Sequence, residues 1–366
     1  MDYGFSLQQW SKTRENYENW WQNKLGRPLV RIGYFDSTGL EDHKGANNRV
    51  TQSSYYDTDI STEYILDYCE YRLLGSQYFG DHYPAVLLDS GPGAVAAYLG
   101  CRPEKDTNGG IWFDPPEGGV GDITGYNLSL DNNNPHYKRM RDITEAAVER
   151  FSQNAVITLP DLGGNMDILS SFFGTEGLSY ALYDNPEDIQ RLLWQSHDAW
   201  HKCFDRFCKI IGKHGDGYTD WSHIYSTKPA YILQSDYAYM IGPEMFDEFV
   251  LPELTQSANR VGRSFYHLDG TGQLAHLDKM LKIESLDGVQ WVPGAGNPLP
   301  SEWPEVLKKI ADAGKLQFIG CDLDGLERVR KAIGSLESVC VSLYDRVTKD
   351  NMDDVLRRLD KMGISF

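Results

Sequence analysis

A histidine and two aspartates in the second half of the chain have the side chains and the spacing that metal or acid–base chemistry needs. His267 and Asp269 follow the apolar run 264–266, and Asp236 follows the run 230–234. Because alternate residues of a strand point to the same side, His267 and Asp269 can face one cavity. The pair can bind one metal ion, or the carboxylate can orient the imidazole for acid–base catalysis. A histidine that only forms local hydrogen bonds in the core is the alternative interpretation.

Other acidic and thiol side chains stand in or at the ends of further apolar runs. Asp89 follows the run 85–88, and Cys340 lies in the run 339–343. A lone aspartate in such a place is often only a helix cap, whereas several that converge on one edge indicate a catalytic site. Cys340 is a candidate third metal ligand, since zinc accepts mixed sulfur, nitrogen and oxygen donors; packing in the core is the alternative. Similar strand-end positions are held by Asp161, Cys321, Asp322 and Asp345.

A second set of side chains is expected to bind the substrate. Arg31 places a charge inside the first apolar run, where it must find a partner or line the cavity. Aromatic residues make up 12% of the chain, and rings around a pocket suit sugars, flat ligands or quaternary ammonium groups, although core packing is their usual role. The polar loop 216–223, which ends in His223, is a weaker candidate or a solvated connection. The other substrate-binding candidates are Tyr34, Asn165, Tyr237, Trp291 and Tyr344.

The position of these residues depends on an alternation of short apolar runs, loops rich in Gly, Asp or Pro, and amphipathic segments. Such an alternation predicts parallel strands joined by crossover helices. The apolar runs are 28–35, 85–88, 155–159, 230–234, 264–266, 288–292, 316–319 and 339–343. A long helix is expected at 186–211, because Asn185 and Pro186 provide a cap followed by a proline in the first turn.

The number of apolar runs indicates a barrel, because eight parallel strands close an α/β barrel whose catalytic groups lie where strands enter the following loops. We therefore predict a single (β/α)8 TIM-barrel domain over residues 1–366, with an N-terminal helical extension and an insertion after the second strand. The segment 100–134 lacks periodicity and is the expected insertion, a hairpin or a lid. An open doubly wound sheet is the rival architecture, but the chain has neither a GxGxxG after the first run nor a P-loop.

The charge of the chain argues against several kinds of partner. With 53 acidic and 35 basic side chains the formal net charge is −18, which repels nucleic-acid phosphates and anionic lipid. It also disfavours a highly anionic substrate unless cations are concentrated in the pocket. The chain has no apolar stretch of membrane-spanning length, no signal-peptide pattern and no CxxC pair among its six cysteines. We expect a cytoplasmic protein with reduced thiols and no nucleic-acid or membrane partner.

Three segments of the chain are similar to motifs of a known superfamily. Residues 234–252 contain QSD and IGPEMFDEFVLP, close to a strand-end aspartate followed by SPE-x-F-x-E-F-x-x-P. The stretch 155–187 is similar to a third barrel strand with its helix, and TKDN at 348–351 is similar to a TP-x-EN segment before a last helix. On these residues the chain resembles the uroporphyrinogen decarboxylase and corrinoid methyltransferase superfamily.

The resemblance implies a methyltransferase that acts on a small molecule. That branch holds zinc through His-x-Cys at the fifth barrel strand and a later cysteine; here His267 matches, Asp269 replaces the first cysteine, and the third place falls to Cys340 or Asp345. We expect a methyl group to move between a small methylated donor and a corrinoid protein or a thiol, with His267, Asp269 and Cys340 on zinc. Asp236 would position the substrate. A corrinoid carried by the partner protein and a homodimer are implied by the same resemblance.

Decarboxylation is the alternative function. The decarboxylases of the superfamily carry an Arg-Gln-Ala-Gly-Arg segment after the first strand, of which only Arg31 remains here. Asp89 falls near their catalytic aspartate. Asp89 would stabilise the charge that develops when a tetrapyrrole or a smaller acid loses its carboxyl group. A glycosidase-like barrel and a barrel that only binds a ligand are the remaining alternatives.

Overall fold

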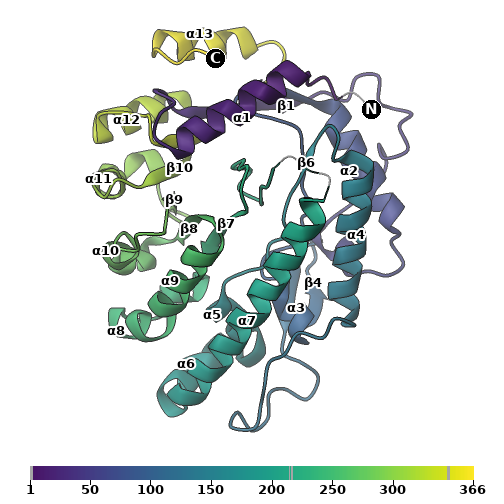
Figure 1. The fold of residues 1–366 in the computed structure, drawn as a ribbon, viewed down its shortest axis with the longest axis vertical. Coiled ribbons are helices and arrows are strands. Elements are labelled where there is room, and N and C mark those ends of the chain that lie inside the picture. The colour runs from purple at the N-terminus through teal and green to yellow at the C-terminus, as the bar shows by residue number, and fades with distance from the viewer. Residues whose placement is uncertain (1–2, 214, 216, 344–346) are drawn as a thin grey trace.

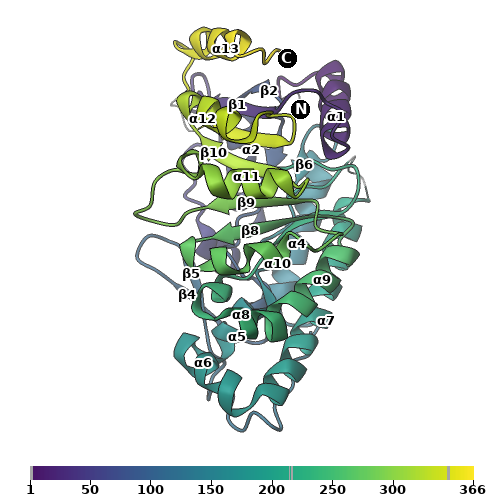
Figure 2. The same cartoon turned by 90° about the vertical axis from the view of Figure 1, so that its left-hand side faces the viewer.

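A mostly parallel sheet runs through the molecule (Figures 1 and 2). The computed structural model describes residues 3–213, 215, 217–343 and 347–366. The main sheet has seven strands in the order β2-β1-β11-β10-β9-β8-β7, and every neighbouring pair except β1–β2 is parallel. The strands span β1 Leu29–Phe35, β2 Ser76–Gly80, β7 Ala230–Gln234, β8 Arg263–Asp269, β9 Gly288–Val292, β10 Leu316–Cys321 and β11 Val339–Leu343.

Each apolar run of the predicted barrel contains a strand, but in the described part of the chain the strands do not close into one hydrogen-bonded sheet. β3 (Ala85–Val86) and β6 (Val156–Ile157) form a separate parallel pair within the described residues. On one side, β2 folds back antiparallel along β1 and takes up the edge that the second barrel strand would need. On the other side, the backbone N–H of Ile232 in β7 donates to the carboxylate of Asp220 (2.7 Å) rather than to a neighbouring strand. The prediction of a closed (β/α)8 sheet is therefore not confirmed.

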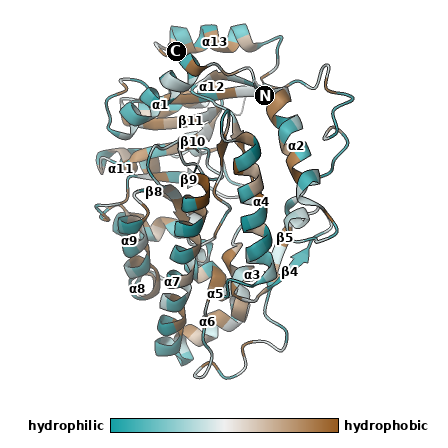
Figure 3. Ribbon diagram, turned by 45° about the vertical axis from the view of Figure 1, so that its right-hand side comes forward, coloured by the Kyte–Doolittle hydropathy of each residue, from teal (hydrophilic) through white to brown (hydrophobic). Residues whose placement is uncertain are grey.

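Helices connect the strands, and different helices pack against the main sheet and against the β3–β6 pair. In Figure 1, α9 to α12 stack along the left side, and α2, α4 and α7 stand on the right. Figure 3 shows mostly hydrophilic residues on the visible faces of α4 and α7, as expected for helices that bury one face. None of the described helices is long and apolar enough to cross a membrane. The helices span α1 Leu7–Trp21, α2 Thr62–Gly75, α3 Val95–Leu99, α4 Pro135–Phe151, α5 Asn165–Phe173, α6 Thr175–Asp184, α7 Pro186–Ile211, α8 Pro243–Met245, α9 Leu251–Arg260, α10 Leu277–Met280, α11 Pro304–Asp312, α12 Leu323–Ile333 and α13 Met352–Lys361.

The N-terminal helix α1 covers the end of the sheet at which the strands begin. Its Trp20 stacks on Phe265 (6.0 Å between ring centroids) within a buried cluster that also contains Leu29 at the start of β1. Glu18 forms an ion pair with Arg263, the first residue of β8 (2.6 Å). Because side chains fill this end, the space for ligands lies at the carboxyl ends of the strands, where polar residues stand.

The expected insertion after the second strand forms a hairpin. β4 (Arg102–Lys105) and β5 (Ile111–Asp114) pair antiparallel and belong to no other sheet in the described part of the chain. Residues 111–115 line a cavity of about 850 Å³ at the ends of the strands. The segment 100–134 therefore contributes directly to the candidate site.

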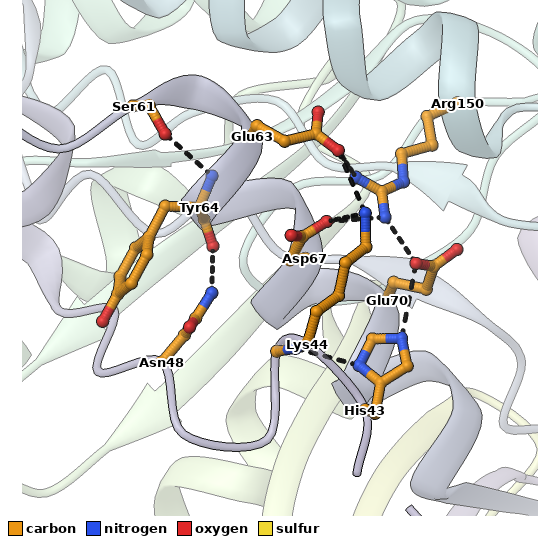
Figure 4. A network of polar contacts seen from close by, with 10 residues as sticks. His43, Lys44, Asn48, Ser61, Glu63, Tyr64, Asp67, Glu70 and Arg150 are labelled. Atoms are coloured by element: carbon orange, nitrogen blue, oxygen red, sulfur yellow. Dashed lines mark hydrogen bonds and ion pairs between the residues drawn. The ribbon is translucent and has the colours of Figure 1, made fainter.

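A network of ion pairs ties α2 to α4 and to the segment before α2 (Figure 4). Arg150 of α4 binds three carboxylates of α2: Glu63 (3.0 Å), Asp67 (2.8 Å) and Glu70. Lys44 adds a second cation at Asp67 (2.6 Å). The carboxylate of Glu70 is almost completely buried, so its charge depends on this network.

Candidate functional site

A cavity of about 850 Å³ opens at the carboxyl ends of β7, β8 and β9. Asp236 follows β7, Asp269 ends β8, and Pro293 follows β9. Asp114 of the hairpin and Asp167 of α5 complete the charged lining, so the described charged residues of this acidic cavity are all aspartates. Negative potential in a cavity attracts cations, which suits a metal ion or a substrate that is not itself an anion.

Two aspartates of the acidic cavity and the neighbouring His267 come close enough to share a metal ion. One donor atom from each of Asp236, His267 and Asp269 lies within 4.8 Å of the other two. His267 Nε2 is 4.0 Å from the nearer carboxylate oxygen of Asp269. The spacing of two along β8 puts these side chains on the same side of the strand, and the parallel pairing of β7 with β8 brings Asp236 beside them.

The imidazole of His267 is held in one orientation by its neighbours. Its Nδ1 lies 2.6 Å from Oε1 of Gln290, which stands opposite His267 in the β8–β9 register. Trp221 packs edge-on against the ring (5.1 Å between centroids). Because Nδ1–H donates to the amide oxygen of Gln290, the lone pair of Nε2 is left on the side of Asp269 and can bind a metal.

Two carboxyl groups of the cavity, those of Asp236 and Asp167, have raised pKa values. Desolvation raises the pKa of Asp236; His267 opposes this rise and Asp269 adds to it. Burial, and secondly the charge of Asp236, raise the pKa of Asp167 to about 7. Asp167 accepts hydrogen bonds from the backbone N–H groups of Asp236 (3.0 Å) and Tyr237 (2.7 Å). It therefore holds the turn after β7 and fixes where Asp236 stands.

Sequence reasoning missed Asp167 and the apolar rim of the cavity. An acidic residue in the first turn of a helix is common for reasons of helix stability alone, so its position in α5 carried no functional signal. The rim includes the exposed side chains of Trp112, Tyr239 and Met240. Tyr237, a predicted substrate-binding residue, does line the cavity, with its hydroxyl 2.8 Å from that of Ser179.

Three other predicted site residues lie away from the acidic cavity. Cys340 packs in the buried cluster beneath α1, where burial raises the pKa of its thiol to about 11, and it is not part of the group around His267. Trp291 is buried in the main hydrophobic core, with its ring against that of Trp303 (5.6 Å between centroids). Asn165 is buried and donates to Glu253 (2.8 Å).

The remaining predicted residues lie elsewhere at the strand ends. Arg31 and Tyr34 line a separate cavity beside β1, and Tyr34 stacks on Phe79 (5.9 Å). Asp89 lines a neighbouring cavity, where its carboxylate accepts from the amide of Gln52 (3.1 Å). Tyr344 and the strand-end Asp345 lie outside the described residues. Asp89 therefore lines a different cavity from the other two catalytic aspartates, Asp236 and Asp269.

Comparison with solved structures relates this fold to that of a known enzyme. The fold is similar to that of a methyltransferase from Methanosarcina mazei, with a TM-score of 0.59 over 96% of this chain and 99% of that chain. The two sequences are 12% identical, so the likeness concerns the fold. No protein-family profile and no curated protein sequence matches the chain.

Proposed function

We propose that this protein is a metal-dependent, methyltransferase-like enzyme whose reaction takes place in the acidic cavity at the ends of β7, β8 and β9. The observation that carries the proposal is that the imidazole of His267 lies beside two carboxylates that line the cavity, with one donor atom from each side chain within 4.8 Å of the other two. Three protein donors with an open side toward a cavity are the pattern of catalytic zinc sites. The likeness of the fold to a methyltransferase supports the same class of reaction.

Zinc suits the donor set that these residues offer. His267 presents Nε2 because Gln290 engages Nδ1, and a fixed tautomer of this kind is typical of metal-binding histidines. Asp236 and Asp269 supply oxygen donors and negative charge that balances the charge of the ion. When bound, zinc would act as a Lewis acid that lowers the pKa of a thiol or polarises a methyl donor.

The chain's own residues would hold and shield a small methylated substrate. Trp112, Tyr239 and Met240 give the mouth of the cavity an apolar surface that suits methyl groups. Asp167 anchors the backbone at Asp236 and Tyr237 and so keeps the carboxylate of Asp236 in place. The second substrate, in this proposal, is a thiol or a corrinoid protein that approaches the open cavity.

The test combines metal analysis and methyl transfer on the same preparations. Wild-type protein purified without a chelator is compared with His267→Ala and with His136→Ala, a half-buried histidine outside the cavity. We expect about one equivalent of zinc in the wild type and in the His136→Ala control, and little in His267→Ala. Methyl transfer from a panel of methylated amines, thiols and ethers to cob(I)alamin should follow the zinc content.

Wild-type protein that carries no metal and transfers no methyl group from any donor would contradict the proposal. Loss of carboxyl groups from uroporphyrinogen, followed by chromatography, would instead support decarboxylation. Because Asp89 lines a different cavity from Asp236 and Asp269, Asp89→Asn should abolish that decarboxylation and leave the zinc content unchanged.

A further inference from the structure

The acidic cavity keeps a negative charge even when the two carboxylates proposed to hold a metal ion are set aside. Asp236 and Asp269 supply two negative charges, which balance those of one divalent cation. Asp114 of β5 adds another, and Asp167, whose pKa is raised to about 7, adds part of one near neutral pH. Within the described residues no lysine, arginine or histidine lines this cavity; Arg102 lies 3.7 Å from the carboxylate of Asp114, but on the exposed side of the hairpin. Such a cavity repels an anionic substrate and attracts a cationic one.

Aromatic rings and a thioether stand around the mouth of this cavity. Trp112 of the hairpin is 67% exposed, and Tyr239, in the turn after β7, is 51% exposed. Neither ring packs against another aromatic ring in the part of the chain that the structure describes. Met240 lines the cavity beside Tyr239 and is also exposed. Apolar side chains gathered in this way at the mouth of a cavity are typical of a binding site for a ligand with apolar groups.

Two glycines hold the ring of Tyr239 next to Asp269. A Cβ atom on Gly270 would lie 2.9 Å from ring carbons of Tyr239, and one on Gly272 would lie 2.7 Å from them, so the ring rests directly on the backbone that follows β8. Gly270 also has a φ of 82°, a left-handed conformation that other residues rarely adopt. Because Asp269 immediately precedes Gly270, an aromatic ring and a carboxylate stand side by side at the end of β8. An organic ammonium group is attracted both by the π face of a ring and by a carboxylate.

Gln234 adds a neutral polar side chain to the lining of the cavity. It is the last residue of β7 and only 8% exposed, and it faces the same side as His267, its partner in the β7–β8 register. Its side-chain amide has no hydrogen-bond partner among the described residues. Because a buried amide without a partner is costly, a ligand with a hydroxyl or another neutral polar group would supply what Gln234 lacks.

We propose that the methylated substrate of the acidic cavity is a small organic ammonium cation, with a trimethylammonium group and an uncharged polar remainder. The rings of Trp112 and Tyr239 and the charge of Asp114 would hold the ammonium group, and Gln234 would bind the polar remainder. The inference rests on the proposed function for the reaction, whereas binding of the cation requires neither the metal nor His267.

The charge of the substrate also suits the transfer of a methyl group. With a thiolate as the acceptor, the bond between the methyl carbon and nitrogen breaks and its electron pair stays on nitrogen. The sulfur supplies the electron pair of the new bond to the methyl carbon. The products are a thioether and a neutral tertiary amine, so the negative potential of the cavity holds the amine less strongly than it held the cation.

The experiment titrates the full-length protein, as purified, with choline in a calorimeter. The comparison ligand is 3,3-dimethyl-1-butanol, which has the shape of choline but a carbon atom in place of the charged nitrogen. Trp112→Leu and Tyr239→Leu each remove one ring, and Asp114→Asn removes one charge; all three side chains are exposed, so the core stays intact. The matched controls are Tyr183→Leu on α6 and Asp198→Asn on α7, two exposed residues that do not line the cavity.

We expect choline to bind the wild type and both controls equally, and to bind each cavity variant about threefold to tenfold more weakly. The uncharged analogue should bind the wild type at least about tenfold more weakly than choline does. No binding of choline, equal binding of choline and its analogue, or wild-type affinity in all three cavity variants would overturn the proposal. Zinc in the protein together with methyl transfer from uncharged donors alone would keep the proposed function and overturn this substrate class. Choline binding by a protein that carries no zinc would support the cation site and contradict the metal-dependent reaction.

Discussion

The hydrogen bond between Gln290 and His267 allows a quantitative test of the candidate metal site. Gln290→Leu keeps the approximate volume of the side chain but removes the acceptor that lies 2.6 Å from His267 Nδ1. A half-buried N–H left without a partner costs about 1–3 kcal/mol, and about 1.4 kcal/mol corresponds to a tenfold change in a binding constant. We therefore expect the zinc affinity to fall by about 10- to 100-fold, the range usual for residues that orient a metal ligand.

Competition with a chromogenic chelator measures the zinc dissociation constant of each variant. Gln317→Leu is the matched control, because Gln317 is buried on the adjacent strand β10 and donates to the backbone of Leu307 in α11 (3.2 Å). The control should bind zinc as tightly as the wild type. The reasoning is refuted if Gln290→Leu also binds zinc with wild-type affinity while His267→Ala binds none, since the orientation of the imidazole would then not depend on Gln290.

Three further predictions concern stability, protonation and the thiol of Cys340. Arg150→Ala should lower the free energy of unfolding by about 3 kcal/mol, because it leaves the buried carboxylate of Glu70 without its arginine; urea denaturation measures this, and a loss no larger than that of Arg357→Ala, on the surface of α13, would contradict it. Because the pKa of Asp167 rises from 3.8 to about 7 on folding, the folded protein retains a proton that the unfolded chain releases between about pH 4 and pH 7. The stability contributed by this proton is present at pH 4 and is lost as the pH rises to 7. Asp167→Asn has no such proton to lose, so its free energy of unfolding should rise relative to that of the wild type between pH 4 and pH 7. A difference in unfolding free energy that is independent of pH would speak against this prediction. Cys340→Ala should leave the zinc content unchanged and cost about 1 kcal/mol of stability, because the thiol packs in the cluster beneath α1; metal analysis and denaturation check both, and a loss of zinc would return Cys340 to the ligand set.

The relation between His267 and Asp269 was predictable because it is local. Two residues of one strand that are two positions apart face the same side whatever the rest of the fold does, and their side chains do lie 4.0 Å apart. The contribution of Asp236 was only partly predictable. Its place at the end of β7 follows from the sequence. Its distance from His267 depends on the β7–β8 register and on the hydrogen bond that the backbone N–H of Asp236 donates to the carboxylate of Asp167.

Cys340 and Trp291 show where sequence reasoning stops. Cys340 faces the interior, but it lies at the level of Leu29 and Phe318 in the buried cluster, below the polar strand ends. Trp291 follows Gln290, whose side chain faces His267, so its own ring turns to the other face of β9. How far a residue lies from the end of the sheet, and which face of the sheet its side chain points to, depend on how the strand pairs with its neighbours. The periodicity of the sequence does not specify that pairing.

The sequence by itself determined the order of strands and helices, the extent of α7 and the pairing of His267 with Asp269, because each follows from the periodicity or the capping of a short segment. The tertiary structure alone decided that the sheet stays open beside β2, that Asp236 rather than Cys340 joins His267, and that Asp114 of the hairpin lines the same cavity as Asp269. These outcomes depend on strand register and on contacts such as that of Asp236 with Asp167, which join residues far apart in the chain and leave no local pattern.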